Sequence, residues 1–197
     1  RGNAGVVVAL ADKLETLVGM FGIGNLPTGD RDPFALRRHA LGVIRMLAEN
    51  DLALPLDTLL RIAALEFTEG LERFEDGADA PAYLEGVTNF IYDRLAGSLR
   101  EQGYTAQEVD AVVSQRPQRL GDIPKRLAAV RAFSALPEAA ALAAANKRVG
   151  NILKKAEVEG PVDAHVNPQL LQEKAEQDLF AALQRFVPEA NAQFDAG

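Results

Sequence analysis

Apolar residues recur every three or four positions along most of the chain, which is the spacing of one buried face of a helix. The first such stripe predicts a helix over residues 6–21, and it consists of Leu10, Leu14, Leu17, Val18 and Phe21. A second stripe follows Asp32 and Pro33, and it consists of Leu36, Ala40, Val43, Ile44 and Leu47. Asp32 is expected to cap this second helix and Pro33 to occupy its first position, because a helix N-terminus has free amides and tolerates a missing one.

The rest of the chain continues the helical pattern. It predicts six more helices, over residues 55–74, 81–102, 106–115, 123–135, 137–156 and 168–186. Thr105 and Glu108 have the spacing of a capping box, and Asp122 precedes the sixth helix as a candidate cap. No alternating β-branched pattern is present, whereas Ala, Leu, Glu, Arg and Gln are abundant. The sequence therefore predicts an all-α multi-helix bundle of about eight helices.

Composition narrows the class of protein. The 197 residues are 48% hydrophobic and include no cysteine, which excludes a disulfide scaffold, a thiolate metal site and a cysteine nucleophile. No uncharged apolar run approaches the roughly 18 residues that a membrane span requires. We therefore expect a soluble cytoplasmic protein without a membrane partner. Because the chain starts at Arg1 without a methionine and ends at Gly197 in a polar stretch, we expect a piece of a longer protein.

Charge is unevenly distributed along the chain. Residues 116–155 contain nine basic and two acidic residues, a net charge of +7, within a chain whose net charge is -7. The remaining residues therefore carry a net charge of -14. This asymmetry is typical of a protein with a polyanionic partner, although solvated helix faces produce it as well.

The predicted helix over residues 137–156 carries the strongest candidate site. At about 100° per residue, five polar or basic side chains share about a third of its circumference, and these are Lys147, Arg148, Asn151, Lys154 and Lys155. Leu142, Val149, Ile152 and Leu153 lie on the opposite side, which we expect to be buried. The basic side chains could bind phosphates with release of counterions. The alternative is that they only complement the negative end of the helix macrodipole.

Two arginines interrupt apolar stripes and are expected to form structural ion pairs, because an unpaired buried guanidinium is very costly. Arg37 lies between Ile44 and Ala48 on the helical wheel, and Arg94 lies among Val87, Phe90 and Ile91. The candidate carboxylate partners are Asp12, Asp30 and Asp32 for Arg37, and Glu66 for Arg94. Pairing of Arg37 would make the glycine-rich loop over residues 22–31 an ordered cover of the helix. The loop matches no phosphate-binding motif, so the signal for a phosphate site there is weak.

No catalytic or metal-binding constellation is visible in the sequence. His39 and His165 are far apart in the chain, and neither belongs to a metal-ligand motif. No Ser-His-Asp arrangement is present that would support nucleophilic catalysis. We therefore assign no catalytic residue, no metal ligand and no cofactor to this chain.

Three sequence blocks resemble the beta subunit of bacterial two-subunit glycyl-tRNA synthetase. The first is the longest, with ALADKLETLVG at residues 9–19, FGIG at 21–24, PTG at 27–29 and DPFALRR at 32–38. The others are FIYDRL at 90–95 and KRVGNIL at 147–153, in the same order as in the family. The resemblance spans most of the chain.

The resemblance implies a division and a role. Residues 1–136 would be an HD-type helical region with following helices, and residues 137–197 would be the truncated start of a helical anticodon-binding domain. The implied role is tRNA binding and subunit assembly in a glycine–tRNA ligase, an aminoacyl-tRNA synthetase of protein biosynthesis. In that family a separate alpha subunit uses ATP to activate glycine, so the implied partners are tRNA and this alpha subunit in a hetero-oligomer, and the fragment itself would be non-catalytic.

Two alternatives to this role remain at the sequence level. Asp12 lies where HD phosphohydrolases have their last metal-binding aspartate, but the chain contains no His-Asp dipeptide, so a hydrolase remnant would lack its metal site. The second alternative is a non-catalytic helical scaffold that binds only protein. A metal assay would identify the first, and a salt-dependent RNA-binding titration would identify the second.

Overall fold

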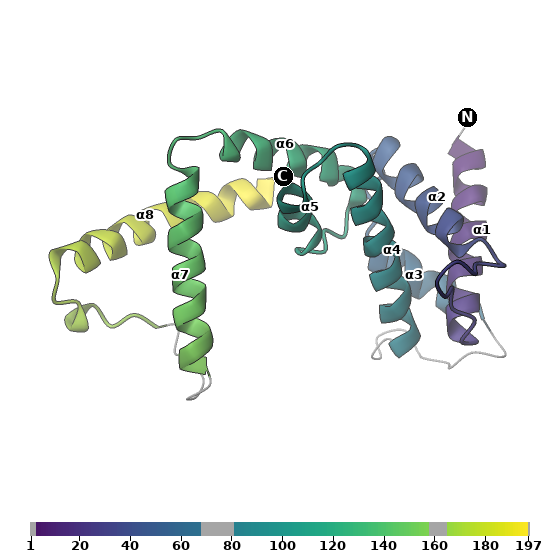
Figure 1. The fold of residues 1–197 in the computed structure, drawn as a ribbon, viewed down its shortest axis with the longest axis horizontal. Helices are drawn as coiled ribbons and strands as arrows, with labels where there is room; N and C mark the ends of the chain where they lie inside the picture. The colour runs from purple at the N-terminus through teal and green to yellow at the C-terminus, as the bar shows by residue number, and fades with distance from the viewer. Residues whose placement is uncertain (1–2, 68–80, 158–164, 197) are drawn as a thin grey trace. The chain divides into compact units, whose positions relative to one another are not determined.

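The computed structural model describes residues 3–67, 81–157 and 165–196, and these residues form an all-α fold (Figure 1). Their eight α-helices are α1 (Asn3–Gly22), α2 (Leu36–Glu49), α3 (Leu56–Leu65), α4 (Ala82–Glu101), α5 (Ala106–Val113), α6 (Ile123–Ser134), α7 (Ala139–Glu157) and α8 (Lys174–Ala196). Two 3-10 turns lie at Leu120–Asp122 and Pro168–Leu170. The chain divides into two compact units, Arg1–Ala139 and Ala140–Gly197. This division lies three residues beyond the expected one at residue 136, while the identity of the two parts stays a prediction.

The first unit is built around α1, which packs against α2, α3 and α4 (Figure 1). Every residue of the two predicted stripes on α1 and α2 is buried, which confirms both. Leu17 and Val18 on α1 and Val43 and Leu47 on α2 are completely shielded from solvent. The core continues into α4, α5 and α6, so the apolar periodicity of the sequence accounts for most of this unit.

The start of α2 differs from the predicted one. Ala35 has left-handed backbone angles (φ 53°, ψ 36°) and precedes the first helical residue, Leu36. The carboxylate of Asp32 still caps the helix, because its two oxygens accept hydrogen bonds from the amides of Leu36 at 2.7 Å and Arg37 at 3.0 Å. Pro33 therefore lies in the turn before α2 rather than in its first helical position.

Residues 116–121, which we call the tying segment, connect α3 to distant parts of the first unit. The carbonyl oxygen and side-chain Oε1 of Gln118 accept hydrogen bonds from the amides of Leu56 and Asp57, both at 3.0 Å. Tyr92 of α4 donates its buried hydroxyl to the carbonyl oxygen of Pro117 at 3.0 Å. Gly121 is buried against Asp51, so closely that an added Cβ would lie 3.1 Å from the Asp51 Cα. The tying segment thus holds the start of α3, α4 and the end of α2 together.

Removal of the buried Tyr92 hydroxyl is expected to destabilise the fold measurably. Burial raises the pKa of this phenol to about 12, so it remains a hydrogen-bond donor at neutral pH. Tyr92→Phe leaves the Pro117 carbonyl without this donor, and we expect the free energy of unfolding to fall by about 1–3 kcal/mol. Urea denaturation measures the change. The matched control is Tyr104→Phe, which we expect to have a smaller effect because the Tyr104 hydroxyl forms no hydrogen bond within the described residues.

The capping box at the start of α5 is confirmed. The hydroxyl of Thr105 accepts a hydrogen bond from the Glu108 amide at 3.2 Å, and Glu108 in turn accepts one from the Thr105 amide at 2.7 Å. The second carboxylate oxygen of Glu108 lies 2.6 Å from Nε of Arg131 on α6, and the Arg131 guanidinium stacks over the ring of Tyr104. These contacts join α5 to α6.

Glu108 predicts an acid-dependent loss of stability. The hydrogen bond from Arg131, followed by that from the Thr105 amide, lowers the pKa of Glu108 from 4.5 to about 2. A carboxylate with a lowered folded-state pKa contributes its full stabilisation above its unfolded pKa and loses it as the pH falls through the folded one. Glu108→Gln should therefore flatten the dependence of the urea midpoint on pH between about 4.5 and 2. Glu101→Gln, at an exposed position that forms no ion pair within the described residues, should leave that dependence unchanged.

Several helix ends differ from the sequence prediction, and the differences at α3, α6 and α8 are the most informative. Helix α3 ends at Leu65, and residues 68–74 of the helix predicted over 55–74 lie outside the described residues. Asp122 does not cap α6, because its backbone is already helical and its carboxylate lies 3.9 Å from Arg119 instead. Helix α8 begins at Lys174 rather than 168 and ends at Ala196 rather than 186, with Pro188 inside it.

The second unit contains helices whose apolar residues face solvent. Leu142, Val149, Ile152 and Leu153 of α7 are 42–58% exposed, so the expected burial of this face is wrong for the described residues. A stripe on α8 is exposed to a similar degree, and it consists of Leu179, Leu183, Phe186 and Val187. Helical spacing identifies an apolar face but does not supply an element that covers it.

None of the described helices is by itself long and apolar enough to cross a membrane. Leu120–Ser134 and Ala139–Ala156 reach the necessary length and composition only when they are taken together as a bent pair.

Candidate nucleic-acid interface

Helix α7 positions the five side chains that the sequence singled out, and we call this set the α7 basic face. Lys147, Arg148, Asn151, Lys154 and Lys155 are all exposed. At a rise of 1.5 Å per residue, the set extends about 12 Å along the helix axis. None of these side chains forms a hydrogen bond or ion pair within the described part of the chain. The four cations are therefore free to bind an external anion.

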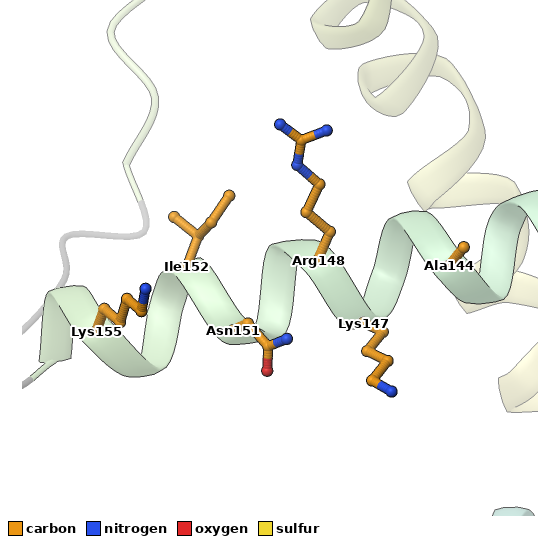
Figure 2. A pocket seen from close by; sticks show the side chains of 6 residues that line it. All are labelled: Ala144, Lys147, Arg148, Asn151, Ile152 and Lys155. Carbon is orange, nitrogen blue, oxygen red and sulfur yellow. The ribbon is translucent and has the colours of Figure 1, made fainter.

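A shallow hollow of about 330 Å³ lies along the α7 basic face, and Ala144 and Ile152 complete its lining. Figure 2 shows Arg148 and Ile152 on one side of the helix and Lys147 and Asn151 on the other, with Lys155 near its end. Ile152 therefore lies beside Arg148 and not on the side of α7 opposite the basic residues, where the sequence prediction placed it. The cationic groups thus spread around a sector rather than converging on one point. Such a spread suits successive phosphates of a backbone better than a single small anion.

The positions of Lys147 and Arg148 distinguish phosphate binding from the macrodipole alternative. Lys154 and Lys155 lie in the last turn of α7, where they complement the negative helix end. Lys147 and Arg148 lie more than two turns before the end at Glu157. Because the macrodipole effect is confined to the terminal turn, it does not account for this second pair.

The other basic residues of the 116–155 stretch lie outside the α7 basic face. Three of them have partners in the fold, because Arg116 donates to Oδ1 of Asn89, Arg119 pairs with Asp122, and Arg131 pairs with Glu108. Lys125 and Arg126 on α6 are exposed and form no ion pair within the described residues. Part of the positive charge that the sequence displays in this stretch is therefore used to hold the first unit together.

The structure corrects the expected ion pair of Arg37. Its guanidinium donates to the backbone carbonyl oxygen of Gly29, and the described residues contain no ion pair between Arg37 and Asp12, Asp30 or Asp32. The carboxylate of Asp12 lies 3.7 Å from Lys13 instead. Thr28 and Arg31 exchange two backbone hydrogen bonds, at 3.0 and 2.7 Å, that close the loop. The loop turns its carbonyl oxygen toward the guanidinium, so a neutral acceptor takes the place of a carboxylate.

Arg94 also differs from its expected pairing with Glu66. Its guanidinium lies over the ring of Phe90, 5.6 Å from the centroid, and its Nε is buried without a hydrogen-bond partner in the described part of the chain. No ion pair joins Arg94 to Glu66 in the described residues. The ring of Phe90, one turn earlier on α4, is the neighbour of the guanidinium instead.

The two histidines belong to different units of the chain. His39 lies on α2 close to Lys13 and Asp12, and burial followed by the charge of Lys13 lowers its pKa. His165 is exposed in the second unit. Within residues 3–67, 81–157 and 165–196, no group of three or more histidine, aspartate or glutamate side chains could hold a metal ion.

Sequence reasoning missed one feature of the first unit. An apolar groove lies between α1 and α3 and includes Val7, Val8 and Ile62. These residues fall outside the stripes that the helical spacing identified. Val7 and Val8 belong to a short apolar run of α1 that is visible in the sequence. That run does not show that α3 forms the other wall of the groove.

The fold and the α7 basic face together define a helical protein with a candidate surface for a polyanion. Residues 1–114 match the family model described as glycyl-tRNA synthetase beta subunit, so the chain belongs to that family. The resemblance noted in the sequence is thereby confirmed.

Individual relatives match over the whole chain. It is 72% identical to the glycine–tRNA ligase beta subunit of Paracidovorax citrulli (strain AAC00-1), 73% to that of Dechloromonas aromatica (strain RCB) and 57% to that of Methylobacillus flagellatus. Each match covers 100% of this chain and 26% or 27% of the relative. The chain thus spans about a quarter of the length of these curated relatives.

Proposed function

We propose that this chain is a tRNA-binding and subunit-assembly part of a glycine–tRNA ligase. Its relatives carry that name, and they match over all 197 residues. In this proposal the chain contributes no catalytic residue, since ATP-dependent activation of glycine belongs to the separate alpha subunit that the family resemblance implies. The chain would support attachment of glycine by holding tRNA within a hetero-oligomer of the two subunits.

The observation that carries the tRNA-binding proposal is the α7 basic face. Four cations without a partner in the described residues lie along about 12 Å of one exposed helix. Each cation that contacts a phosphate releases condensed counterions, which favours binding to a polyanion. Because four of the five side chains of the α7 basic face are cations, this surface fits the negatively charged sugar–phosphate backbone.

The assembly part of the proposal is supported by unburied apolar surface. Leu179, Leu183 and Phe186 of α8 occupy one helical stripe and are 50–62% exposed. Contiguous exposed apolar surface of this kind is typical of regions that contact another element or subunit. An assembly role gives this stripe a neighbour, whereas tRNA binding alone does not.

A titration of tRNA at several salt concentrations, with the longer beta subunit that contains this chain, tests the proposal. We expect the logarithm of the binding constant to fall linearly with the logarithm of salt concentration, by about 0.7–0.9 for each phosphate neutralised. The control is a titration with a neutral polymer of similar length. Binding of tRNA that is absent or independent of salt contradicts the proposal and favours a scaffold that binds only protein.

A further inference from the structure

The groove between α1 and α3, called here the α1–α3 groove, is an open apolar surface of the first unit. It encloses about 790 Å³, and its walls include Val7 and Val8 of α1, Ile62 of α3 and the preceding Leu54. Val7 and Val8 are 65% and 69% exposed, and Ile62 is 53% exposed. Below these residues lie Leu10 and Leu14, which belong to the buried core. The groove is therefore an opening in the side of the helical core.

The charged residues that line the α1–α3 groove in the described part of the chain are all acidic. They are Asp12 and Glu15 on α1 and Glu66 at the end of α3. Lys13 lies 3.7 Å from Asp12 and offsets that carboxylate. Glu15 and Glu66 form no ion pair within the described residues. An apolar floor with unpaired carboxylates favours an occupant that carries apolar side chains flanked by lysine or arginine.

We propose that the α1–α3 groove holds an amphipathic helix from another part of the same beta-subunit polypeptide, outside these 197 residues. Its apolar side chains lie against Val8 and Ile62, and its lysine or arginine side chains pair with Glu15 and Glu66.

Two observations select this occupant. The match covers 26% of a relative's length, so most of such a polypeptide lies outside these residues. A segment of the same molecule is present at a high effective concentration, which favours it over a second copy or a separate subunit. The proposal is independent of tRNA binding, because the groove lies in the first unit and α7 belongs to the second.

Accessibility of single cysteines tests the proposal, since the chain has no cysteine of its own. Ile62→Cys and, as a second probe, Val8→Cys are introduced separately into this chain and into the longer beta subunit. Both positions are exposed here, so the substitutions are compatible with the fold. The control is Ala111→Cys, at an exposed position on α5 outside the groove. The rate of reaction with a thiol reagent is followed by mass spectrometry of the labelled peptides.

We expect the thiols introduced at positions 62 and 8 to react at least about tenfold more slowly in the longer subunit than in this chain, as tethering of an occupant implies. The control thiol at position 111 should react at the same rate in both. A thiol-to-amine crosslinker on the cysteine at position 62 should join a lysine-containing peptide of the same molecule, as shown by mixing isotopically labelled and unlabelled protein. Adding the double substitution Glu15→Lys, Glu66→Lys should restore most of the lost reactivity.

Four results overturn the proposal. Equal reactivity of the two groove thiols in this chain and in the longer subunit means that the groove stays open. Protection that appears only at high protein concentration assigns the groove to a second copy. Protection that requires the alpha subunit assigns it to that partner. Protection unchanged by reversal of Glu15 and Glu66 excludes a basic occupant.

Discussion

Replacing Arg148 and Lys155 by glutamate in the longer beta subunit is expected to weaken tRNA binding and to flatten its dependence on salt. Both side chains lie on the exposed α7 basic face, and neither has a partner in the described residues. Each lost phosphate contact should reduce the salt slope by roughly one unit. Because both residues are exposed to solvent, the helix itself should remain folded.

The competing explanation for the α7 cations predicts different effects on stability and on tRNA affinity. If they only complement the helix end, the same substitutions should cost about 0.3–1 kcal/mol of stability each and leave tRNA affinity unchanged. Melting temperature and salt-dependent affinity, measured on one double variant, distinguish the two explanations. The matched control is Arg38→Glu with Arg100→Glu, which makes the same change in net charge at exposed positions of α2 and α4. Equal loss of affinity in both double variants would show a general charge effect instead of a local site.

Leu17→Ala is expected to lower the free energy of unfolding by about 2–5 kcal/mol. Leu17 lies in the middle of α1, and its side chain is completely shielded from solvent. Because α1 packs against α2, α3 and α4, the cavity opens where three helix contacts meet, and little of the surroundings can collapse into it. Urea denaturation measures this loss as a lower transition midpoint, and we expect the dependence of the unfolding free energy on urea concentration to stay unchanged.

Leu183→Ala is the matched control for this core substitution. Leu183 lies inside α8 and is 51% exposed, so the same chemical change removes little buried surface. In this chain alone, without the neighbour that the proposed assembly role gives Leu183, we expect the effect to stay within about 0.5 kcal/mol. A loss at position 183 as large as the loss at position 17 would mean that the described exposure of α8 does not hold in solution.

Local periodicity accounts for what could be predicted of the fold. The stripes on α1 and α2 are specified by residues within one helix, and both are buried as expected. The capping box of Thr105 and Glu108 was predictable for the same reason, since all its donors and acceptors lie within four residues.

Features that depend on distant residues or on backbone path were not predictable. The wheel places Arg37 on the inner side of α2, but the loop conformation decides that Gly29 offers a carbonyl oxygen there. The left-handed Ala35 delays the start of α2, although Asp32 and Pro33 form a good start signal. The same limit applies to α7, where the sequence gives the direction of its apolar face and not the presence of a neighbour.

The candidate site was partly accessible from sequence. Spacing alone places Lys147, Arg148 and Asn151 in one sector of a helix, and the structure has them exposed on α7. The α1–α3 groove was not accessible, because its two walls come from helices separated by more than thirty residues. A surface formed by two elements requires their packing, which no single stripe encodes.

Helix α3 should open together with the tying segment rather than by itself. Its N-cap residue, Pro55, makes no side-chain capping hydrogen bond. The free amides of Leu56 and Asp57 donate to Gln118 of the tying segment instead. A ten-residue helix is too short to persist alone in water. Amide hydrogen exchange at Leu56 and Asp57 should therefore follow the opening of residues 116–121, so that helix α3 and the chain before α6 behave as one cooperative unit.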